Sequence, residues 1–561
     1  METNNRINPY DKVYQNNPDH NQVYPNNPYP VQPMAVAVKR EDSAYTKKLK
    51  EHFPFFGIGS ALYALFYTFC LYRNTSGITY PFFVIGTLCY FFFSMQKLGV
   101  PYKKDSVFYI ISIVLLGISN CLTNSEQLLL MNKCGIFLLS FILLIHTIYM
   151  DASWNFPKYF AALAQTIGTA FSCLLRPFSD MVFYFDAQKQ EKSGKKSYFI
   201  PILIGIAITI PVLLIMTLLL AYADVVFFNI LENIFFAFNF STIFHICFLM
   251  VVVFFGSYAV CAALGMKNIK EEVKNRRVLE PVIAIIVTAT LSVLYLIFSM
   301  IQILYLFIGN MQLPYNFTYS GYARQGFFQL LAVCILNLLI VLTCLHFFRE
   351  NTVLKIILTI ISGCTFIMIL SSALRMLMYI SRYNLTFLRI FVLWALAVIF
   401  LLMAGVIIYI YKNKFPLFTY SMVIVTVFYI GLSFAHPDYW IAKYNLNSMH
   451  LDEYSPYDNK GYMSSLSADA APILLNEENN PYLKANVLGD AAVEDIIKNW
   501  DAIDLHAAEY EGIPYTKEKL KDTYNKLKWL HNYYNKIDDL HEDMHVRNFN
   551  FSIYTAGKYI K

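Results

Sequence analysis

The chain has 561 residues, of which 57% are hydrophobic and 15% charged, with a formal net charge of +6 and a mean hydropathy of +0.45. Soluble domains carry roughly 25% charged and 45–50% apolar residues, so this composition excludes a cytosolic enzyme, a nucleic-acid reader and a secreted disulfide scaffold. Ten cysteines lie between Cys70 and Cys364 without a CxxC pair, and we expect them to pack as small apolar side chains.

The first 54 residues are rich in Asn, Pro and Tyr, and the hexapeptide VYQNNP at 13–18 returns as VYPNNP at 23–28. Such a segment has too few aliphatic side chains to offset the entropy of ordering it. We therefore expect residues 1–54 to form a disordered cytoplasmic tail that acts as a tether. A peptide docking site is the alternative.

Eleven apolar runs follow, each close to the roughly 17–25 residues that cross a hydrocarbon core about 30 Å thick. They are residues 55–72, 78–96, 106–122, 134–149, 199–222, 243–264, 282–308, 327–347, 353–380, 389–411 and 415–433. The fourth is the least regular because Asn132 and Lys133 interrupt it. The pattern predicts an all-α, polytopic integral-membrane helical bundle of about 11 transmembrane helices over residues 55–434.

Lysine and arginine are distributed unequally between alternate loops. One set of loops, which begins with the tail, carries 23 of these residues, and the opposite set carries five. Because cytoplasmic loops retain positive charge, we expect a multi-pass protein of the cytoplasmic membrane with its N-terminus inside and its C-terminus outside.

Within the third inner loop, residues 156–178 place apolar side chains at helical spacing between Trp154 and Arg176. This stretch is typical of an amphipathic helix lying along the cytoplasmic interface. A short re-entrant or bundle-packed helix is the alternative.

The last part of the chain, residues 435–561, is rich in charge and holds six of the eleven histidines. Apolar residues recur at helical spacing over 491–509 and again after Thr516, with Gly512 and Pro514 between the two stretches. We expect a small extracytoplasmic helical region, a hairpin docked on the outer ends of the spans. Its docking residues would be Val493, Ile496, Trp500, Leu520, Tyr524, Leu527 and Tyr534.

Several separate stretches carry a family resemblance. They are residues 220–227, Phe298 with Gln302, 318–330, 371–376, Leu385-Thr386 with Arg389, 436–445 and 462–472. In combination they resemble the uncharacterised bacterial integral-membrane family catalogued as domain of unknown function 4173, related to the group numbered 4153. The resemblance implies a polytopic bacterial membrane protein and brings no known activity. This chain has Tyr222, Gln325, Asn384 and His436 where Ser, Glu, Gly and Asn are common, and the Gln argues against an acid–base role at 325.

Alternating topology places the polar residues of these stretches at one level, the outer ends of the spans. The candidate cluster consists of Asp224, Gln302, Tyr322, Arg324, Gln325, Gln329, Arg375, Arg389, Asp438, Tyr444, Asn445 and Asp469. The arginines could pair with Asp224, Asp438 and carbonyls as a structural latch. Alternatively, they could bind an anionic lipid headgroup or a carrier-lipid phosphate, because guanidinium presents a planar fork to phosphate.

The sequence His541-Glu542-Asp543-Met544-His545 matches HExxH, in which two histidines one helical turn apart bind zinc beside a glutamate base. A third ligand would have to come from upstream, from His506, Glu509 or His531. We interpret the match as a solvated helix face and expect no metal and no cofactor.

The leading interpretation is therefore a non-enzymatic sensor, scaffold or envelope-associated protein, whose partners are the lipid bilayer and an anionic lipid, and not nucleic acid. A secondary transporter, which needs polar or broken helices near the midplane, and a zinc-dependent membrane hydrolase are the alternatives.

Overall fold

A computed structural model describes most of the chain from Ser43 onward, which forms one compact unit, Ser43–Lys561. The described residues are 43–74, 76–191, 209, 212–213, 216–217, 219–224, 226–228, 240–272, 277–304, 319–448, 460–484, 486–488, 491–502, 509–510, 513–514 and 517–560. Residues 1–42 of the expected tether therefore lie outside the described residues.

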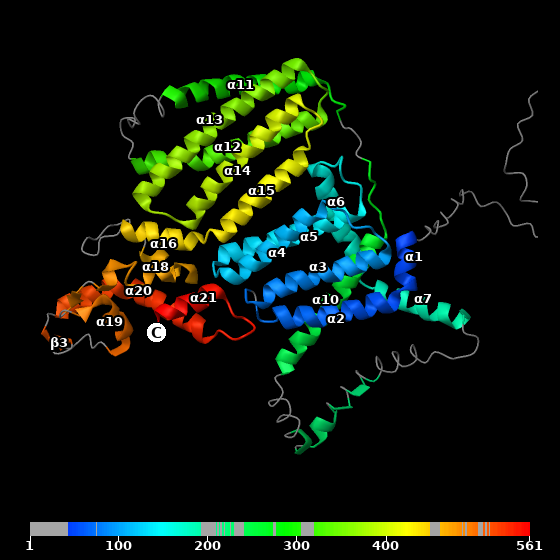
Figure 1. Cartoon of the computed structure of the whole chain (residues 1–561), viewed down its shortest axis with the longest axis horizontal. Coiled ribbons are helices and arrows are strands. Elements are labelled where there is room, and N and C mark those ends of the chain that lie inside the picture. Colours follow the sequence, from blue (N-terminus) through cyan, green and yellow to red (C-terminus); the bar gives the residue numbers. More distant parts are fainter. Residues whose placement is uncertain are drawn as a thin grey trace, which may run out of the picture. The chain divides into compact units, whose positions relative to one another are not determined.

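Long apolar helices dominate this unit (Figure 1). They are α2 (Phe53–Leu71), α3 (Thr79–Leu98), α4 (Ser106–Leu122), α5 (Glu126–Ile148), α10 (Phe240–Gly265), α11 (Pro281–Gln302), α12 (Tyr319–Phe347), α13 (Thr352–Tyr383), α14 (Phe387–Tyr411) and α15 (Leu417–Phe434). Nine of these, counted within the described ranges, are long and apolar enough to cross a membrane, and α4 is an apolar helix of 17 residues. The expected span at 199–222 falls mostly outside the described residues. The all-α polytopic fold is confirmed.

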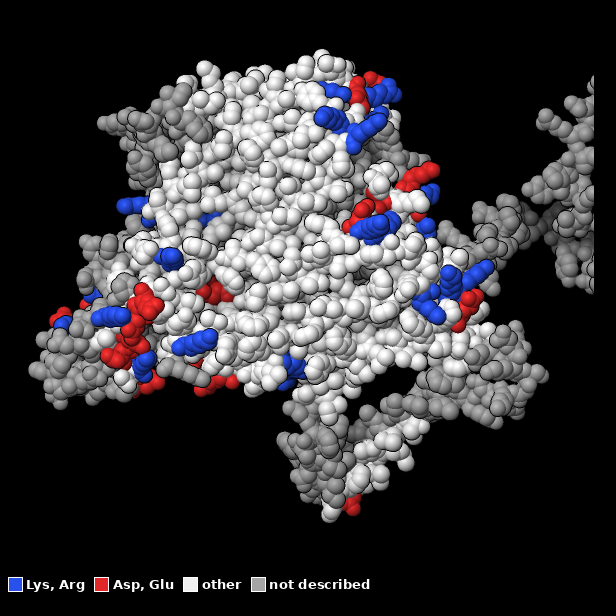
Figure 2. Space-filling view, viewed as in Figure 1, with Lys and Arg blue, Asp and Glu red and all other residues white. Residues whose placement is uncertain are grey.

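The helices form two neighbouring groups. In the first, α2 packs against α3 and α10, and α4 against α3 and α5; in the second, α13 packs against α11, α12 and α14. Helix α15 contacts both α14 and α4, so it joins the groups. On the face drawn in Figure 2, charged side chains gather toward the two ends of the helices, and the surface between them is mostly uncharged.

Helix α5 begins at Glu126, eight residues before the expected span. Asn132, which was expected to interrupt the span, lies within α5, and its side-chain amide is fully buried against neighbouring helices. Asn132 Nδ2 donates to Ser119 of α4, and its Oδ1 accepts from Tyr429 and Ser433 of α15. A satisfied buried amide of this kind fixes how helices pack.

At one end of the helices, which we call the α1 end, short helices cover the bundle. Helix α1 (Ala44–Glu51) packs there through the buried Leu49, and Ser43 Oγ donates to the carbonyl of Gly265 at 2.5 Å. The last part of the expected disordered tail is therefore wrong, because Ala44–Glu51 is a helix packed on the bundle and α2 begins at Phe53.

The expected amphipathic stretch forms α6 (Phe156–Ser172), followed by α7 (Arg176–Glu191). Helix α6 packs against α10 and buries Tyr159, while Phe160 on its other face is 75% exposed.

At the opposite end lies a region that we call the cap, residues 435–560. Its helices are α16 (Pro437–Asn447), α17 (Lys460–Ser465), α18 (Ala471–Leu474), α19 (Val493–Lys498), α20 (Lys517–Glu542) and α21 (Phe551–Ala556), with 3-10 turns η2 (Ala468–Ala470), η3 (Pro481–Lys484), η4 (Trp500–Ala502) and η5 (Gly557–Tyr559). Two short antiparallel pairs join β1 (Asn486–Leu488) to β2 (Ala491–Ala492) and β3 (Glu509–Tyr510) to β4 (Ile513–Pro514).

The first arm of the expected hairpin is not one continuous helix: α19 ends at Lys498, the 3-10 turn η4 follows, and Glu509 lies in a strand. Packing explains the break: the Trp500 ring stacks on Tyr524 and His531 of α20, with centroid distances of 3.9 and 4.4 Å. The second arm is present as α20. Of the residues expected to dock the hairpin on the bundle, Val493, Ile496, Trp500 and Leu527 lie in the hydrophobic core of the cap itself.

Candidate functional site: the junction between the cap and the helix ends

The cap lies against the ends of both helix groups (Figure 1) and is hydrogen-bonded to a turn of each. The α2–α3 turn pairs with it through Ile78 N, which donates to Phe549 O at 2.7 Å. The α13–α14 turn pairs through Asn445 of α16, whose amide accepts from Leu385 N at 2.7 Å and donates to Leu385 O at 2.9 Å. These contacts make the junction continuous across the two groups.

Asp469, in η2, is the hub of this junction. Its side chain is 1% exposed, and its carboxylate accepts from Thr123 Oγ1 at 2.5 Å, from Asn124 N at 3.3 Å and from Ser552 Oγ. His436 Nδ1 lies 3.3 Å from the same carboxylate. One carboxylate thus joins the α4–α5 turn to the start of α16 and to α21.

The neighbouring buried carboxylate belongs to Asp438, on the first turn of α16. It is 4% exposed and accepts from Ser467 N at 3.2 Å. Burial raises the pKa of Asp438, and the nearby Asp469 adds to that rise. The hydrogen bond to Asp469 raises the pKa of His436, whose backbone is held in the left-handed region at φ +47°.

Helix α20 holds the loop between these two carboxylates. Tyr533 is fully buried and donates to Ser467 O at 2.7 Å, while Lys536 Nζ donates to Ser465 O and Leu466 O at 2.9 and 3.0 Å. Burial lowers the pKa of Lys536 and raises that of Tyr533.

Asn550 connects the end of the cap to the same turns. Its Oδ1 caps α21 by accepting from Ser552 N at 2.9 Å, and its Nδ2 donates to Ser76 O and Thr123 O at 3.1 and 3.0 Å. An Asn at the start of a helix is a recognisable cap signal, and it could have predicted α21. No periodicity marks Thr123, Ser552, Tyr533 or Lys536, which sequence reasoning missed.

The candidate arginines lie in two other places. Arg389, at the start of α14, donates from Nη1 to the carbonyl of Tyr383 at 2.6 Å and to that of Asn384, and its guanidinium lies 4.3 Å from the centre of the Tyr379 ring. The last carbonyls of a helix lack donors within the helix, and the Arg389 guanidinium supplies donors and a positive charge at the C-terminus of α13.

Arg375 is buried within α13, and its Nη2 donates to Gln302 Oε1 of α11 at 3.1 Å. Ser371 donates to the same oxygen at 2.6 Å. Helix α12 passes close by at Gly326, where an added Cβ would lie 2.0 Å from Arg375 Nη1. The small residue therefore permits the approach of α12 to the buried arginine.

The structure thus joins Gln302 to Arg375, and it brings Asp438, Asp469 and Asn445 into the cap junction. It places others apart. Asp224 is exposed, and its Oδ1 accepts from the backbone of Val226 and Phe227. Gln329 is exposed, and Tyr444 is 41% exposed. The side chains of Tyr322, Arg324 and Gln325 lie outside the described residues, although α12 contains their backbone.

The HExxH match does not lie on one helix. Helix α20 ends at Glu542, so His541 occupies its last turn, while the backbone N–H of His545 donates to Asn548 Oδ1 beyond the helix end. Two histidines need a shared helical face to bind zinc in this pattern. Within the described ranges, no group of three or more His, Cys, Asp or Glu side chains is placed to hold a metal ion.

These features define a multi-pass, all-α membrane protein with a folded cap over one end of its helices. Residues 110–477 match the family described as Domain of unknown function (DUF4153), and the chain belongs to that family. The matched stretch runs from α4 into the cap and includes Arg375, Arg389, Asp438 and Asp469. No curated protein and no solved structure matches the chain.

Proposed function

We propose that the protein is a non-enzymatic scaffold or sensor of the bacterial cytoplasmic membrane, in which the cap couples the two helix groups. The supporting observation is that the cap is bonded to both groups: the buried Asp469 carboxylate accepts from the α4–α5 turn, and the Asn445 amide pairs with Leu385 in the α13–α14 turn. A cap attached in this way moves with the helix ends beneath it. A ligand or partner that bound the cap would therefore bias the packing of the helices.

Complementation separates this function from a hydrolase. A deletion strain under envelope stress should be rescued by the wild type and by Glu542→Gln, which removes the base of the HExxH match. Asp469→Ala should fail to rescue because the cap detaches. Failure of Glu542→Gln at normal protein levels would instead favour the enzyme.

We propose that the cap lies outside the cell. The alternate loops that begin with the N-terminal tail carry 23 lysines and arginines and the opposite loops carry five, and positive loops stay in the cytoplasm. An alkaline phosphatase fusion at Lys561 should be active, and a fusion in the α14–α15 loop, at Lys412, should be inactive. The reverse pattern would overturn the orientation.

We also propose that an anionic group, a lipid headgroup or carrier-lipid phosphate, binds beside Arg389. This side chain is half-buried, and its described contacts are two carbonyls and a tyrosine ring, so no carboxylate among them balances its charge. Guanidinium retains further donors suited to phosphate oxygens.

The test measures lipid phosphate that co-purifies with the protein. Arg389→Gln, and equally Arg324→Gln, should lose bound anionic lipid while the cap stays resistant to protease. The matched control is Lys443→Gln, which removes an exposed charge from α16 at the same end. If the wild type carries no lipid and Arg389→Gln unfolds, Arg389 acts only as a structural latch.

Finally, we propose that the chain is close to the group numbered 4173 within this set of related families, on the strength of the stretches at 371–376, 436–445 and 462–472. An alignment of near relatives in which these stretches vary freely would contradict that placement.

A further inference from the structure

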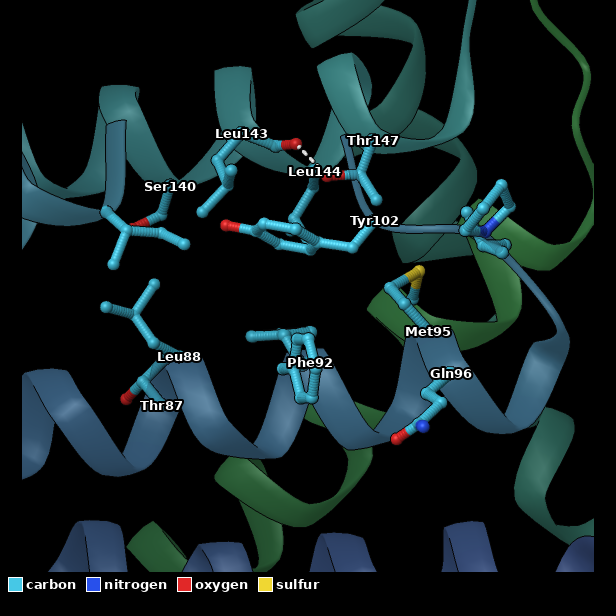
Figure 3. A pocket seen from close by; sticks show the side chains of 14 residues that line it. Thr87, Leu88, Phe92, Met95, Gln96, Tyr102, Ser140, Leu143, Leu144 and Thr147 are labelled. Carbon is cyan, nitrogen blue, oxygen red and sulfur yellow. Dashed lines mark hydrogen bonds between the residues drawn. The ribbon is translucent and has the colours of Figure 1, made fainter. Parts of the chain in front are cut away.

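An apolar groove of about 280 Å³ lies between α3, α4 and α5 (Figure 3). Its walls include Leu88, Phe92 and Met95 of α3, and Leu143 and Leu144 of α5. Tyr102, from the α3–α4 turn, points into the space between α3 and α5 (Figure 3).

The position of the groove along the helices matches one leaflet of a bilayer. Its lining runs along α3 from Thr87 to Gln96, about 14 Å at the helical rise per residue. A hydrocarbon core is about 30 Å thick, so this length is about half of it. The groove occupies the half nearest the C-terminus of α3 at Leu98, which is the α1 end.

A positive side chain stands at that end of the groove. Lys104, in the α3–α4 turn two residues after Tyr102, is exposed. Lys103 Nζ donates to Tyr149 O at 2.6 Å, and Lys97 points away from the groove, with its Nζ 5.8 Å from the centre of the Phe55 ring of α2. The nearby acidic groups are Asp105, which is exposed, and Asp151, which is buried and 3.5 Å from Lys103 Nζ. Lys104 thus presents a cation where a phospholipid headgroup would lie.

We propose that this groove binds one acyl chain of an anionic phospholipid from the leaflet at the α1 end, with its phosphate beside Lys104. An apolar groove gains dispersion contacts when a chain fills it, and basic residues near the membrane surface attract anionic headgroups. Tyr102, 41% exposed, lies at the level where aromatic side chains favour the interface. The site is at the opposite end of the helices from Arg389 and does not depend on the proposed function.

The experiment titrates detergent-purified full-length protein with phosphatidylglycerol or phosphatidylcholine and counts bound lipids by native mass spectrometry. The wild type should retain phosphatidylglycerol in preference to phosphatidylcholine. The variant Lys104→Gln should weaken phosphatidylglycerol retention about 5-fold and leave phosphatidylcholine unchanged. The control Lys414→Gln removes one exposed charge at the same end and should have no effect.

A second pair of variants tests the acyl chain. Ser140→Phe, on α5, fills the groove and should reduce retention of both lipids, whereas Ile111→Phe enlarges a side chain of α4 that is 54% exposed and should not. Equal retention of the two lipids by the wild type, or unchanged phosphatidylglycerol retention in Lys104→Gln, would overturn the proposal. Arg389→Gln should leave the groove occupied by lipid. A failure of the groove proposal can therefore be told apart from a failure of the anion site proposed beside Arg389.

Discussion

Replacing Asp469 by alanine removes an acceptor that three donors share. Thr123 Oγ1 and Asn124 N belong to the α4–α5 turn, Ser552 Oγ belongs to α21, and His436 approaches from the start of α16. The carboxylate is almost completely buried, so its partners would lose their acceptor in a site where water is largely excluded. The change therefore acts on the attachment of the cap rather than on any single element.

The magnitude follows from burial and from the number of bonds. A hydrogen bond to a charged group contributes about 1.5–3 kcal/mol net, and removing one partner from a buried charged pair costs about 3–5 kcal/mol. We expect Asp469→Ala to lower the free energy of unfolding of the cap by about 3–5 kcal/mol. Asp469→Asn should cost less, about 1–3 kcal/mol, because the hydroxyls of Thr123 and Ser552 can rotate to suit an amide.

Pulse proteolysis in urea, on protein in detergent, measures this loss through the fragments of the cap. Asp522→Asn is the control, because its carboxylate is 60% exposed and pairs with Lys526 one turn along α20. Such a surface pair contributes about 0.3–0.5 kcal/mol. Coincident urea midpoints for Asp469→Ala and Asp522→Asn would refute the assignment of Asp469 as the hub of the junction.

Three further predictions follow from other contacts. Trp500→Ala should destabilise the cap by about 3–5 kcal/mol because the indole is 6% exposed; unchanged proteolysis would count against it. Gly326→Ala should cost about 1–3 kcal/mol through overpacking against Arg375, seen as a lower midpoint of thermal aggregation. His436→Asn should remove a pH-dependent contribution to the free energy of unfolding of the cap. Asp469 raises the pKa of His436 above 6.5, so this contribution is complete below pH 6.5 and is lost as pH rises through the raised pKa. A wild-type-minus-variant difference in cap stability that grows with pH would contradict this assignment.

The membrane helices could be predicted because their signal is local. A run of apolar side chains about 20 residues long has few other stable arrangements, and the bounds of α4 agree with the expected 106–122. The start of α5 could not be predicted, because Asn132 is acceptable in a membrane helix only when Ser119, Tyr429 and Ser433 satisfy it.

The candidate site was predictable only in part. The family-like stretches pointed to Asp438, Asn445 and Asp469, which the structure brings to one junction, and to Gln302 with Arg375, which form a separate contact. The hydroxyl partners of Asp469 escaped notice because a lone Thr123 or Ser552 carries no pattern. The end of α20 at Glu542, which separates His541 from His545, depends on how the following segment folds back onto the bundle.

The sequence by itself determined the all-α membrane class, the order of the apolar helices and the unequal charge of the loops, because hydropathy and loop charge are read residue by residue along the chain. Only the tertiary structure decided which polar groups meet. Thr123 and Asp469 lie 346 residues apart, yet their side chains share one hydrogen bond. Their meeting depends on the packing of α4, α15 and the cap together, and buried polar groups are stable only where that packing supplies their partners.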